Sequence, residues 1–191
     1  MQRIQSVLAR TLPGGKVNRV EKILVPLVVA LLFIGWLLNT PPGLLGKADA
    51  LGYAVCHRIE VRSFLLGERA LPLCARCSGM YLGALLGLGY QSLLFGRRAG
   101  MPPKSVLVAF GLFVVAFGVD GVNSYFHLFP GFTGLYEPQN ALRLLTGTGM
   151  GLAIAGMVFP AFNQTVWRGW DATPAFKNIL SLLPLVFLAL V

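Results

Sequence analysis

Apolar residues occur along the chain in five blocks, which are separated by shorter segments containing polar residues, prolines and glycines. The blocks cover about residues 23–39, 78–95, 105–121, 142–162 and 176–191. A helix needs about 20 residues to cross the hydrocarbon core of a bilayer, because each residue adds only about 1.5 Å to its length. The pattern therefore predicts about five transmembrane helices, of which the last is short for a full crossing.

The composition places the chain among integral membrane proteins. Hydrophobic residues make up 55% of its 191 residues, charged residues make up 12%, and the mean hydropathy is +0.71. These values are too apolar for an ordinary soluble domain. We therefore expect an all-α integral membrane protein with a basic N-terminal segment, residues 1–22, and a single membrane domain, residues 23–191. The first block is longer than the core of a signal peptide, which favours a retained anchor.

Lys and Arg residues give a net charge of +9 and lie mainly at the ends of the apolar blocks. This placement favours a role in topology over nucleic-acid binding, for which no aromatic–basic pattern is present. The N-terminal segment and the segments after the second and fourth blocks are basic, whereas residues 122–141 contain neither Lys nor Arg. We expect a multi-pass protein of the cell membrane with a cytoplasmic N-terminus and with the loop after the first block outside, although that loop also contains arginines. Residues 1–10 fit either an interfacial amphipathic helix or an unstructured basic tail.

The loop between the first and second blocks, residues 50–77, holds all three cysteines and one of the two histidines. Strand-like runs at residues 59–66 and 70–73 flank a turn at residues 67–69, which predicts a hairpin. The hairpin would bring Cys56 and His57 beside Cys74 and Cys77. Cys-x-x-Cys is the spacing of structural zinc sites, and a Cys₃His set fills a tetrahedron. These four residues are the candidate ligands of a transition metal, zinc or iron, with His57 either binding the ion or orienting its ligands.

The same cysteines allow two other interpretations. Cys77 lies at the predicted start of a helix, where backbone N–H groups stabilise a thiolate. Cys74 and Cys77 are therefore also candidates for thiol–disulfide exchange with Cys56 as a third thiol, and this chemistry needs no metal cofactor. Three unrelated buried cysteines would be chemically inert. Their clustering argues against that interpretation.

Polar residues in the third and fourth blocks are expected on the same side of the membrane as the cysteines. Asp120, Asn123 and His127 lie on one helical stripe, and Asn140 and Arg143 follow near the start of the next helix. Charged residues at this depth are costly unless they are paired or functional, so we expect either an Asp120–Arg143 ion pair or a polar pocket beneath the cysteine loop. The candidate pocket residues are Arg58, Arg62, Arg76, Asp120, Asn123, Asn140 and Arg143.

Glycines recur at four-residue spacing in the second and fourth blocks. They are Gly79, Gly83 and Gly87 in the one and Gly147 and Gly151 in the other. Small residues at this spacing let membrane helices approach closely. We expect the second and fourth blocks to pack together with the third beside them, or the glycine faces to receive partner membrane subunits.

Three segments of the chain together resemble one known family. They are Cys56-His57-Arg58, Arg62-Ser63-Phe64 and residues 71–83, Leu-Pro-Leu-Cys-Ala-Arg-Cys-Ser-Gly-Met-Tyr-Leu-Gly. The likeness extends to Asp120-Gly121 and to residues 140–147. The chain resembles a family of small bacterial and archaeal multi-span membrane proteins described as a domain of unknown function. The resemblance covers about residues 50–155 and implies no reaction, and residues 136–139 are less polar than its pattern implies.

The sequence therefore leaves three functions open. The first is a membrane protein with a Cys/His metal site at the outer face beside a polar pocket. The second is a membrane thiol–disulfide oxidoreductase, although no dinucleotide-binding motif is present. The third is a structural subunit of a larger membrane complex. The expected partners are the lipid bilayer and, for the third function, other membrane subunits, whereas nucleic acid is not expected. The sequence does not decide whether the protein is an enzyme.

Overall fold

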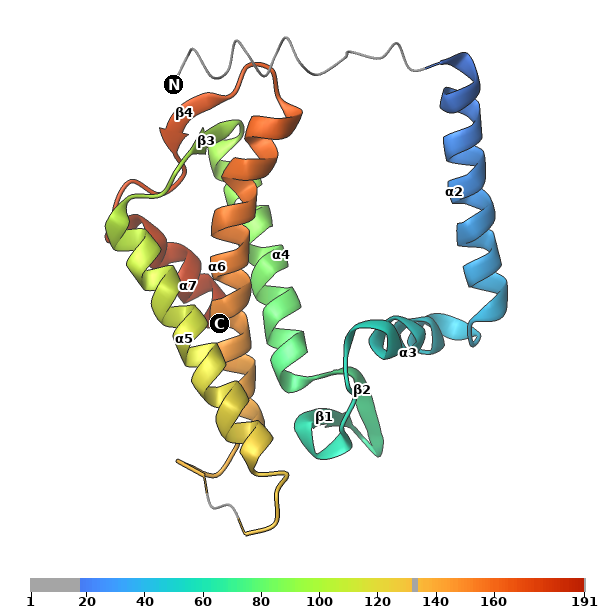
Figure 1. The fold of residues 1–191 in the computed structure, drawn as a ribbon, viewed down its shortest axis with the longest axis vertical. Helices are drawn as coiled ribbons and strands as arrows, with labels where there is room; N and C mark the ends of the chain where they lie inside the picture. Colours follow the sequence, from blue (N-terminus) through green and yellow to red (C-terminus); the bar gives the residue numbers. More distant parts are fainter. Residues whose placement is uncertain (1–17, 132–133, 191) are drawn as a thin grey trace. The chain divides into compact units, whose positions relative to one another are not determined.

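The computed structural model describes residues 18–131 and 134–190, so the expectations for residues 1–10 and for most of the basic segment lie outside the described residues. The chain divides into two units, residues up to Ala50 and residues from Leu51 onward. Figure 1 shows the elements in chain order. Most of the described chain is helical, as expected for this class of membrane protein. Two small sheets are also present, of which the sequence predicted only the hairpin in the cysteine loop.

The first unit contains helix α2, Arg19–Asn39, and most of helix α3, Gly43–Val55. Helix α2 ends at Asn39, just before the two prolines at positions 41 and 42, because a proline disfavours the helical conformation of the residue that precedes it. The ammonium group of Lys47 donates hydrogen bonds to Thr40 O at 3.1 Å and Thr40 Oγ1 at 2.6 Å. Lys47 thereby satisfies carbonyl groups that the end of a helix leaves without partners.

Three helices of the described chain are long and apolar enough to cross a membrane: Val20–Asn39, Lys104–Phe126 and Asn140–Val166. Two of the five predicted spans do not meet this criterion. Helix α4, Ala75–Phe95, has the length but is not apolar enough by this criterion. The predicted span at residues 176–191 contains only the 3₁₀ turn η2, Ile179–Leu182, and the short helix α7, Leu183–Leu190.

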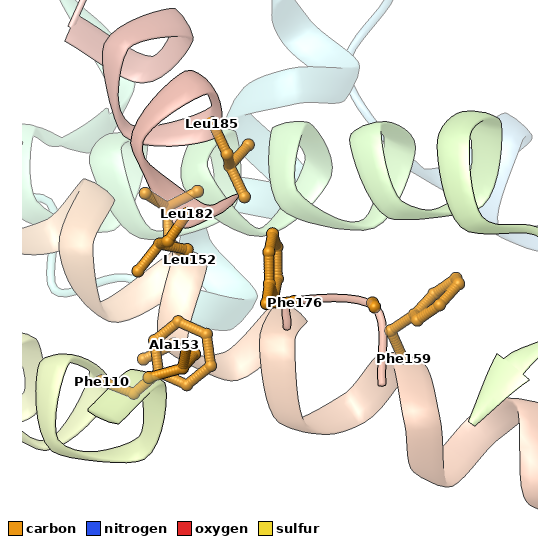
Figure 2. Close-up of a cluster of buried hydrophobic side chains, with 9 residues drawn as sticks. Phe110, Leu152, Ala153, Phe159, Phe176, Leu182 and Leu185 are labelled. Atoms are coloured by element: carbon orange, nitrogen blue, oxygen red, sulfur yellow. The ribbon is translucent and has the colours of Figure 1, made fainter. Parts of the chain in front are cut away.

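The second unit is a helical bundle in which α4, α5, Lys104–Phe126, and α6, Asn140–Val166, run side by side (Figure 1). Its apolar core lies toward the start of α5 and the end of α6, where α7 and the segment before it pack. Figure 2 shows this cluster, in which Phe176 lies between residues of α5, α6 and α7. The buried members are Val106, Phe110, Leu152, Ala153, Phe159, Ala175, Phe176, Leu182 and Leu185.

Helices α4 and α6 pack closely through their glycine faces, as the sequence predicted. A Cβ atom added to Gly79 would meet the carbonyl oxygen of Leu144, and one added to Gly151 would meet that of Met80. Only glycine permits this approach of two backbones, which gains dispersion contacts where lipid supplies no hydrophobic drive. Because the two faces contact each other within the chain, they are not available to a partner subunit.

The predicted hairpin is present in the cysteine loop. The 3₁₀ turn η1, Glu60–Arg62, leads into β1, Ser63–Leu66, which pairs antiparallel with β2, Arg69–Cys74. The first strand is shorter than predicted because the turn η1 occupies its expected beginning. Leu66 pairs with Arg69, which leaves a two-residue turn in which Gly67 has a φ of +65°. A positive φ of this kind favours glycine.

The sequence did not predict a second sheet, in which β3, Arg98–Gly100, pairs parallel with β4, Asp171–Pro174. Asn163, near the end of α6, donates hydrogen bonds through Nδ2 to Gly96 O at 3.0 Å and Arg98 O at 2.8 Å. This sheet lies at the opposite end of the bundle from the hairpin (Figure 1). The hairpin, the start of α4, the end of α5 and the start of α6 therefore share one end.

Candidate metal centre and polar network

Three structural elements deliver the three cysteines to one place. Cys56 follows the last turn of α3, where its backbone N–H donates to Gly52 O at 2.9 Å. Cys74 is the last residue of β2, and Cys77 lies in the first turn of α4. The sulfur atoms of the three residues all lie within 4.8 Å of one another, and none forms a disulfide. The hairpin thus closes the cysteine loop as the sequence predicted.

The surroundings of Cys56 favour its thiolate. Burial acts to raise the pKa of this thiol, but hydrogen bonds from the backbone N–H groups of Cys74 and Arg58 and from the neighbouring thiols outweigh burial, so the pKa lies below its ordinary value. Of these bonds, the one from Cys74 N to Cys56 Sγ measures 3.3 Å. Cys74 is 2% exposed, and Cys56 and Cys77 are half-buried. Three thiols, one of them with a lowered pKa, form a suitable donor set for a soft or borderline cation.

The spacing of the sulfur atoms fits a single metal ion. A zinc ion binds cysteine sulfur at about 2.3 Å in tetrahedral geometry, which places two sulfur ligands about 3.8 Å apart. The separations of up to 4.8 Å observed here reach that value after shifts of less than about 1 Å. Rotations of the cysteine side chains supply shifts of this size without movement of the backbone.

His57 does not belong to this group of three cysteines. Its Nδ1 accepts a hydrogen bond from the backbone N–H of Ile59 at 3.0 Å. A neutral imidazole that accepts through Nδ1 carries its proton on Nε2, so neither nitrogen offers a lone pair to a metal in this arrangement. Burial and then the nearby guanidinium groups, chiefly that of Arg62, hold the pKa of His57 below its usual value. That His57 binds a metal stays a prediction, and binding would require the bond to Ile59 to break.

Arg58 has an unusual backbone conformation for a residue other than glycine, with a φ of 50°. This conformation is uncommon for a residue with a Cβ atom, and it reverses the chain directly after Cys56-His57. The guanidinium of Arg58 lies 4.3 Å from the ring centroid of Tyr53, as in a cation–π contact.

The polar residues predicted beneath the cysteine loop do form a connected network, which centres on Asp120. This carboxylate is 1% exposed and forms an ion pair with Arg76, whose Nε donates to Asp120 Oδ2 at 3.1 Å. The Tyr136 hydroxyl donates to Asp120 Oδ1 at 2.8 Å, and the Thr146 hydroxyl donates to Oδ2 at 3.5 Å. Charge-assisted hydrogen bonds of this kind offset the cost of burying a carboxylate.

The expected ion pair between Asp120 and Arg143 is wrong, because Arg76 takes that position. Arg143 instead donates through Nη1 to Asn140 Oδ1 at 2.7 Å and through Nε to Ser124 Oγ at 3.4 Å. The physical reason is the close approach of α4 and α6, which brings the first turn of α4 against α5. Arg76 then reaches Asp120 from the turn that also carries Cys77.

Three guanidinium groups converge on Ser124, which is fully buried. Arg62 Nη2 donates to Ser124 O at 2.6 Å, and Arg76 Nη2 donates to Ser124 Oγ at 3.1 Å. Arg143 reaches the same hydroxyl through Nε. Arg62 is 8% exposed and Arg143 is 6% exposed. We call Arg62, Arg76 and Arg143 the arginine cluster.

The segment between α5 and α6 is held by Asn123. Its side chain donates from Nδ2 to Tyr136 O at 2.9 Å and accepts at Oδ1 from Leu135 N at 2.8 Å. His127 Nδ1 lies 2.8 Å from Asn123 O. These bonds position the Tyr136 hydroxyl against Asp120. Burial, with the Asp120 carboxylate as a second cause, raises the pKa of Tyr136 to about 12, so this hydroxyl stays protonated near neutral pH.

Asn140 connects the network to the cysteine loop. Its Nδ2 donates to Ser63 O at 3.2 Å, and Ser63 pairs with Cys74 in the hairpin. Of the seven predicted pocket residues, the network therefore joins Arg62, Arg76, Asp120, Asn123, Asn140 and Arg143.

Sequence reasoning missed Ser124, Tyr136 and Thr146. Ser124 follows Asp120 by four residues, and Thr146 follows Arg143 by three, so helical spacing was an available signal for both. Tyr136 gave no such signal, because its place depends on the fold of the loop. The family resemblance implied only that residues 136–139 are less polar than expected.

Comparison with known proteins covers the part of the chain that contains the candidate site. Residues 56–157 match the model of a family described as "Predicted membrane protein (DUF2085)". The match spans more than half of the chain, so the chain belongs to this family. The matched range contains the three cysteines and the whole network around Asp120. The resemblance inferred from the sequence is therefore confirmed.

Two archaeal relatives share this region. An uncharacterized protein of Methanocaldococcus jannaschii is 28% identical over 115 residues, which cover 60% of this chain and 67% of that protein. An uncharacterized protein of Methanothermobacter thermautotrophicus is 34% identical over 102 residues, which cover 52% of this chain and 82% of that protein. No solved structure matches the chain.

Proposed function

We propose that this member of the DUF2085 family binds one transition-metal ion, zinc, through the thiolates of Cys56, Cys74 and Cys77. The observation that carries the proposal is the convergence of three sulfur atoms from three separate elements to within 4.8 Å. The hairpin connects the segment that carries Cys56 to Cys74 at the end of β2, and α4 with Cys77 follows directly. A metal ion would stabilise this loop because its binding free energy adds to the free energy of folding.

A site with three thiolates leaves one position of a zinc tetrahedron open. Closed four-ligand sites are typical of structural zinc, whereas catalytic zinc keeps a position for water or substrate. An ion held here would act as a Lewis acid at the edge of the polar network. His57 can close the site only after its Nδ1 releases Ile59. The proposal is thus a metal centre with one exchangeable position, and its reaction is not assigned.

We also propose that the cysteine loop lies outside the cell. At the opposite end of the bundle, Arg97, Lys104 and Arg168 are exposed in short segments of the kind enriched on the cytoplasmic side. At the cysteine end, Arg62 and Arg76 form hydrogen bonds inside the fold. Charges built into a site carry less information on topology than charges in bare flanking segments. The arginines of the cysteine loop are therefore weaker evidence against an outer location of the loop than their number suggests.

Helix α4 is proposed to cross the membrane together with α5 and α6. It runs between the same two ends of the bundle (Figure 1). Its 21 residues span about 31 Å, close to the thickness of the hydrocarbon core. Its glycine face is covered by α6, so the low hydropathy of that face does not meet lipid. The segment Ile179–Leu190 would then lie within the membrane against α4 and α5 without crossing it.

A thiol–disulfide exchange function is the second candidate, and the lowered pKa of Cys56 favours it. An attacking thiol must be a thiolate and must be accessible. Cys74 is almost fully buried, whereas Cys56 is half-buried. In this case Cys56 would be the nucleophile, and Cys74 with Cys77 would form the disulfide that it attacks. A partner protein or a quinone would have to supply or accept the electrons.

Metal analysis combined with thiol counting separates the two functions. Protein purified in a mild detergent, without chelator, should contain about one zinc per chain and three free thiols after denaturation. Cys56→Ser, Cys74→Ser and Cys77→Ser should each lower the zinc content by tenfold or more, since two thiolates bind zinc far more weakly than three. Ser92→Ala, an exposed serine of α4, is the matched control and should keep its zinc. Metal-free protein with one disulfide would support thiol exchange instead.

A further inference from the structure

We propose that the arginine cluster binds the phosphate group of an anionic membrane lipid. In this arrangement the lipid chain occupies an apolar cavity between α5, α6 and α7. The proposal rests on the charge and burial of the cluster and on the position of the cavity, and it does not depend on a metal at the cysteines. It assigns a class of ligand to the polar network. The metal proposal assigns no ligand to that network.

The cluster carries more positive charge than the fold neutralises. Among the residues that the structure describes, Asp120 is the one carboxylate that hydrogen-bonds to it, and its oxygens are engaged by Arg76, Tyr136 and Thr146. Three positive charges thus face one negative charge, which leaves two positive charges. A zinc ion with three thiolates has a net charge of minus one, so one positive charge would still remain.

The two arginines without a carboxylate partner are the most buried of the cluster. Arg62 and Arg143 are 8% and 6% exposed, and they donate hydrogen bonds to neutral groups, the oxygens of Ser124 and Asn140. A buried cation without a counter-charge is strongly unfavourable, because it has lost its hydration. A bound anion would supply that counter-charge.

The chemistry of the cluster suits phosphate in particular. Each guanidinium has five N–H groups in a planar fork, and the bonds observed here use only some of them. The fork matches the oxygens of phosphate two at a time. Lysine would offer a point charge without this geometry, and the cluster contains no lysine.

An apolar cavity of about 460 Å³ shares one residue, Thr146, with the network around Asp120. Phe113 and Ala116 of α5, Leu145 and Thr146 of α6 and Val186 of α7 contribute to its wall. Thr146 belongs both to this wall and to the network, since its hydroxyl donates to Asp120. Ala116 precedes Asp120 by one helical turn, a rise of about 6 Å.

The volume of the cavity lies within the range of roughly 300–1,000 Å³ for ligand sites. A chain in the cavity and a phosphate on the cluster are the two parts of one amphiphile. Free phosphate would use the cluster alone and leave the cavity without a role. This is why the cavity favours a lipid as the source of the phosphate.

Thermal unfolding of the full-length protein in micelles of a neutral detergent tests the proposal with three probes. They are dioctanoyl phosphatidylglycerol, dioctanoylglycerol, which has the same chains without phosphate, and inorganic phosphate. Only the phosphatidylglycerol should raise the unfolding temperature in a saturable way. Arg62→Gln and Arg143→Gln should each raise its half-saturating concentration about tenfold, the effect of losing a charge-assisted hydrogen bond. Arg168→Gln, an exposed arginine at the opposite end, is the control and should leave that concentration unchanged.

Four results would overturn the proposal. An equal response to dioctanoylglycerol, or an unchanged response of Arg62→Gln and Arg143→Gln, would show that the cluster does not bind the phosphate. An equal shift with inorganic phosphate would rule out a lipid as its source. Ala116→Phe fills the cavity and should weaken the response to phosphatidylglycerol, so an unchanged response would place the chain elsewhere.

If the glutamine variants do not fold, Arg62→Lys and Arg143→Lys keep the charge and remove the fork, and the same tenfold change is expected. Phosphorus analysis of extensively washed wild-type protein gives a second readout, with about one tightly bound phospholipid per chain expected. The absence of bound phospholipid, together with an unchanged response of the lysine variants to phosphatidylglycerol, would also overturn the proposal. Zinc-free protein that still responds to phosphatidylglycerol would contradict only the metal proposal.

Discussion

Arg76 and Asp120 form an ion pair that joins the first turn of α4 to α5. Arg76 Nε donates to Asp120 Oδ2 at 3.1 Å, and Arg76 Nη2 donates to the same carboxylate oxygen and, at 3.0 Å, to Asp120 O. Because Arg76 lies between Cys74 and Cys77, the pair also ties the candidate metal centre to the bundle. The pair is therefore one of the connections between the two parts of the candidate site, beside the bond from Asn140 to Ser63.

Removing one member of this pair should destabilise the protein more than removing both. Asp120→Asn or Arg76→Gln alone leaves a charge with no partner, and we expect a loss of about 3–5 kcal/mol in the free energy of unfolding. The double variant should recover a large part of that loss. A double-mutant cycle of unfolding in detergent micelles measures the coupling.

Arg143→Gln provides the comparison for this cycle, because Arg143 touches Asn140 and Ser124 and not Asp120. Its coupling to Asp120→Asn should be smaller than that of Arg76→Gln. Equal couplings, or strict additivity for Arg76 with Asp120, would contradict the ion pair.

Tyr136→Phe should destabilise the protein by about 1.5–3 kcal/mol, since the hydroxyl donates to a buried carboxylate. The effect should depend on pH in the alkaline range. The pKa of Tyr136 rises from its ordinary value near 10 to about 12 in the folded protein, so the folded state holds this proton more tightly than the unfolded state. The resulting stability is fully present below about pH 10 and is lost as the pH rises through 12.

Unfolding of the wild type and of Tyr136→Phe, measured from pH 8 to pH 11, checks the direction of this pH dependence. The difference in stability between the two proteins should narrow as the pH rises. Tyr125→Phe, an exposed tyrosine of α5, serves as the control. A difference that widens or stays constant would show that the hydroxyl does not donate to Asp120 in the folded protein.

The sequence predicted the parts of this site that depend on local spacing. The hairpin and the closeness of the three cysteines followed from the strand pattern and the turn at Gly67. The packing of α4 on α6 followed from glycines at four-residue spacing, such as Gly83 and Gly151. Successive membrane helices cross in opposite directions, which placed the cysteine loop and the polar residues between α5 and α6 on the same side.

Features that depend on the rotation of helices about their axes were not predictable in this way. The sequence analysis considered only Arg143 as a partner for Asp120, and the choice of Arg76 instead depends on how α4 is rotated against α5. Tyr136 enters the network through a loop without regular periodicity. The second sheet escaped prediction because β3 and β4 are short and lie about 70 residues apart.

Gly83→Ala should destabilise the bundle, whereas Gly89→Ala in the same helix should not. A Cβ atom at Gly83 would strike the carbonyl oxygen of Thr148, so the two helices must separate, at a cost of about 1–3 kcal/mol. A Cβ atom at Gly89 meets nothing within 4 Å, and alanine should stabilise the helix there by about 0.5–1 kcal/mol. Thermal unfolding in micelles checks both values. Equal effects of the two changes would contradict the observed packing of α4 on α6.

The proposed topology predicts which residues a membrane-impermeant maleimide reaches in intact cells. Cysteines introduced at Glu68, in the turn of the hairpin, and at Glu137 should react from outside. A cysteine at Arg168, at the opposite end of the bundle, should react only after permeabilisation. The parent chain with its three native cysteines supplies the background. Labelling of Arg168→Cys alone in intact cells would reverse the orientation, and different results for Glu68 and Glu137 would separate two regions that the fold places together.

X-ray absorption at the zinc edge of the purified protein tests the central claim most directly, because it counts the atoms bound to the ion. The account predicts three sulfur neighbours at about 2.3 Å and one oxygen or nitrogen neighbour at about 2.0–2.1 Å. In His57→Ala the three sulfur neighbours should remain, since the Nδ1 of His57 is occupied by the N–H of Ile59. A zinc ion without sulfur neighbours, or a protein that binds no zinc while its three thiols are free, would contradict the metal centre.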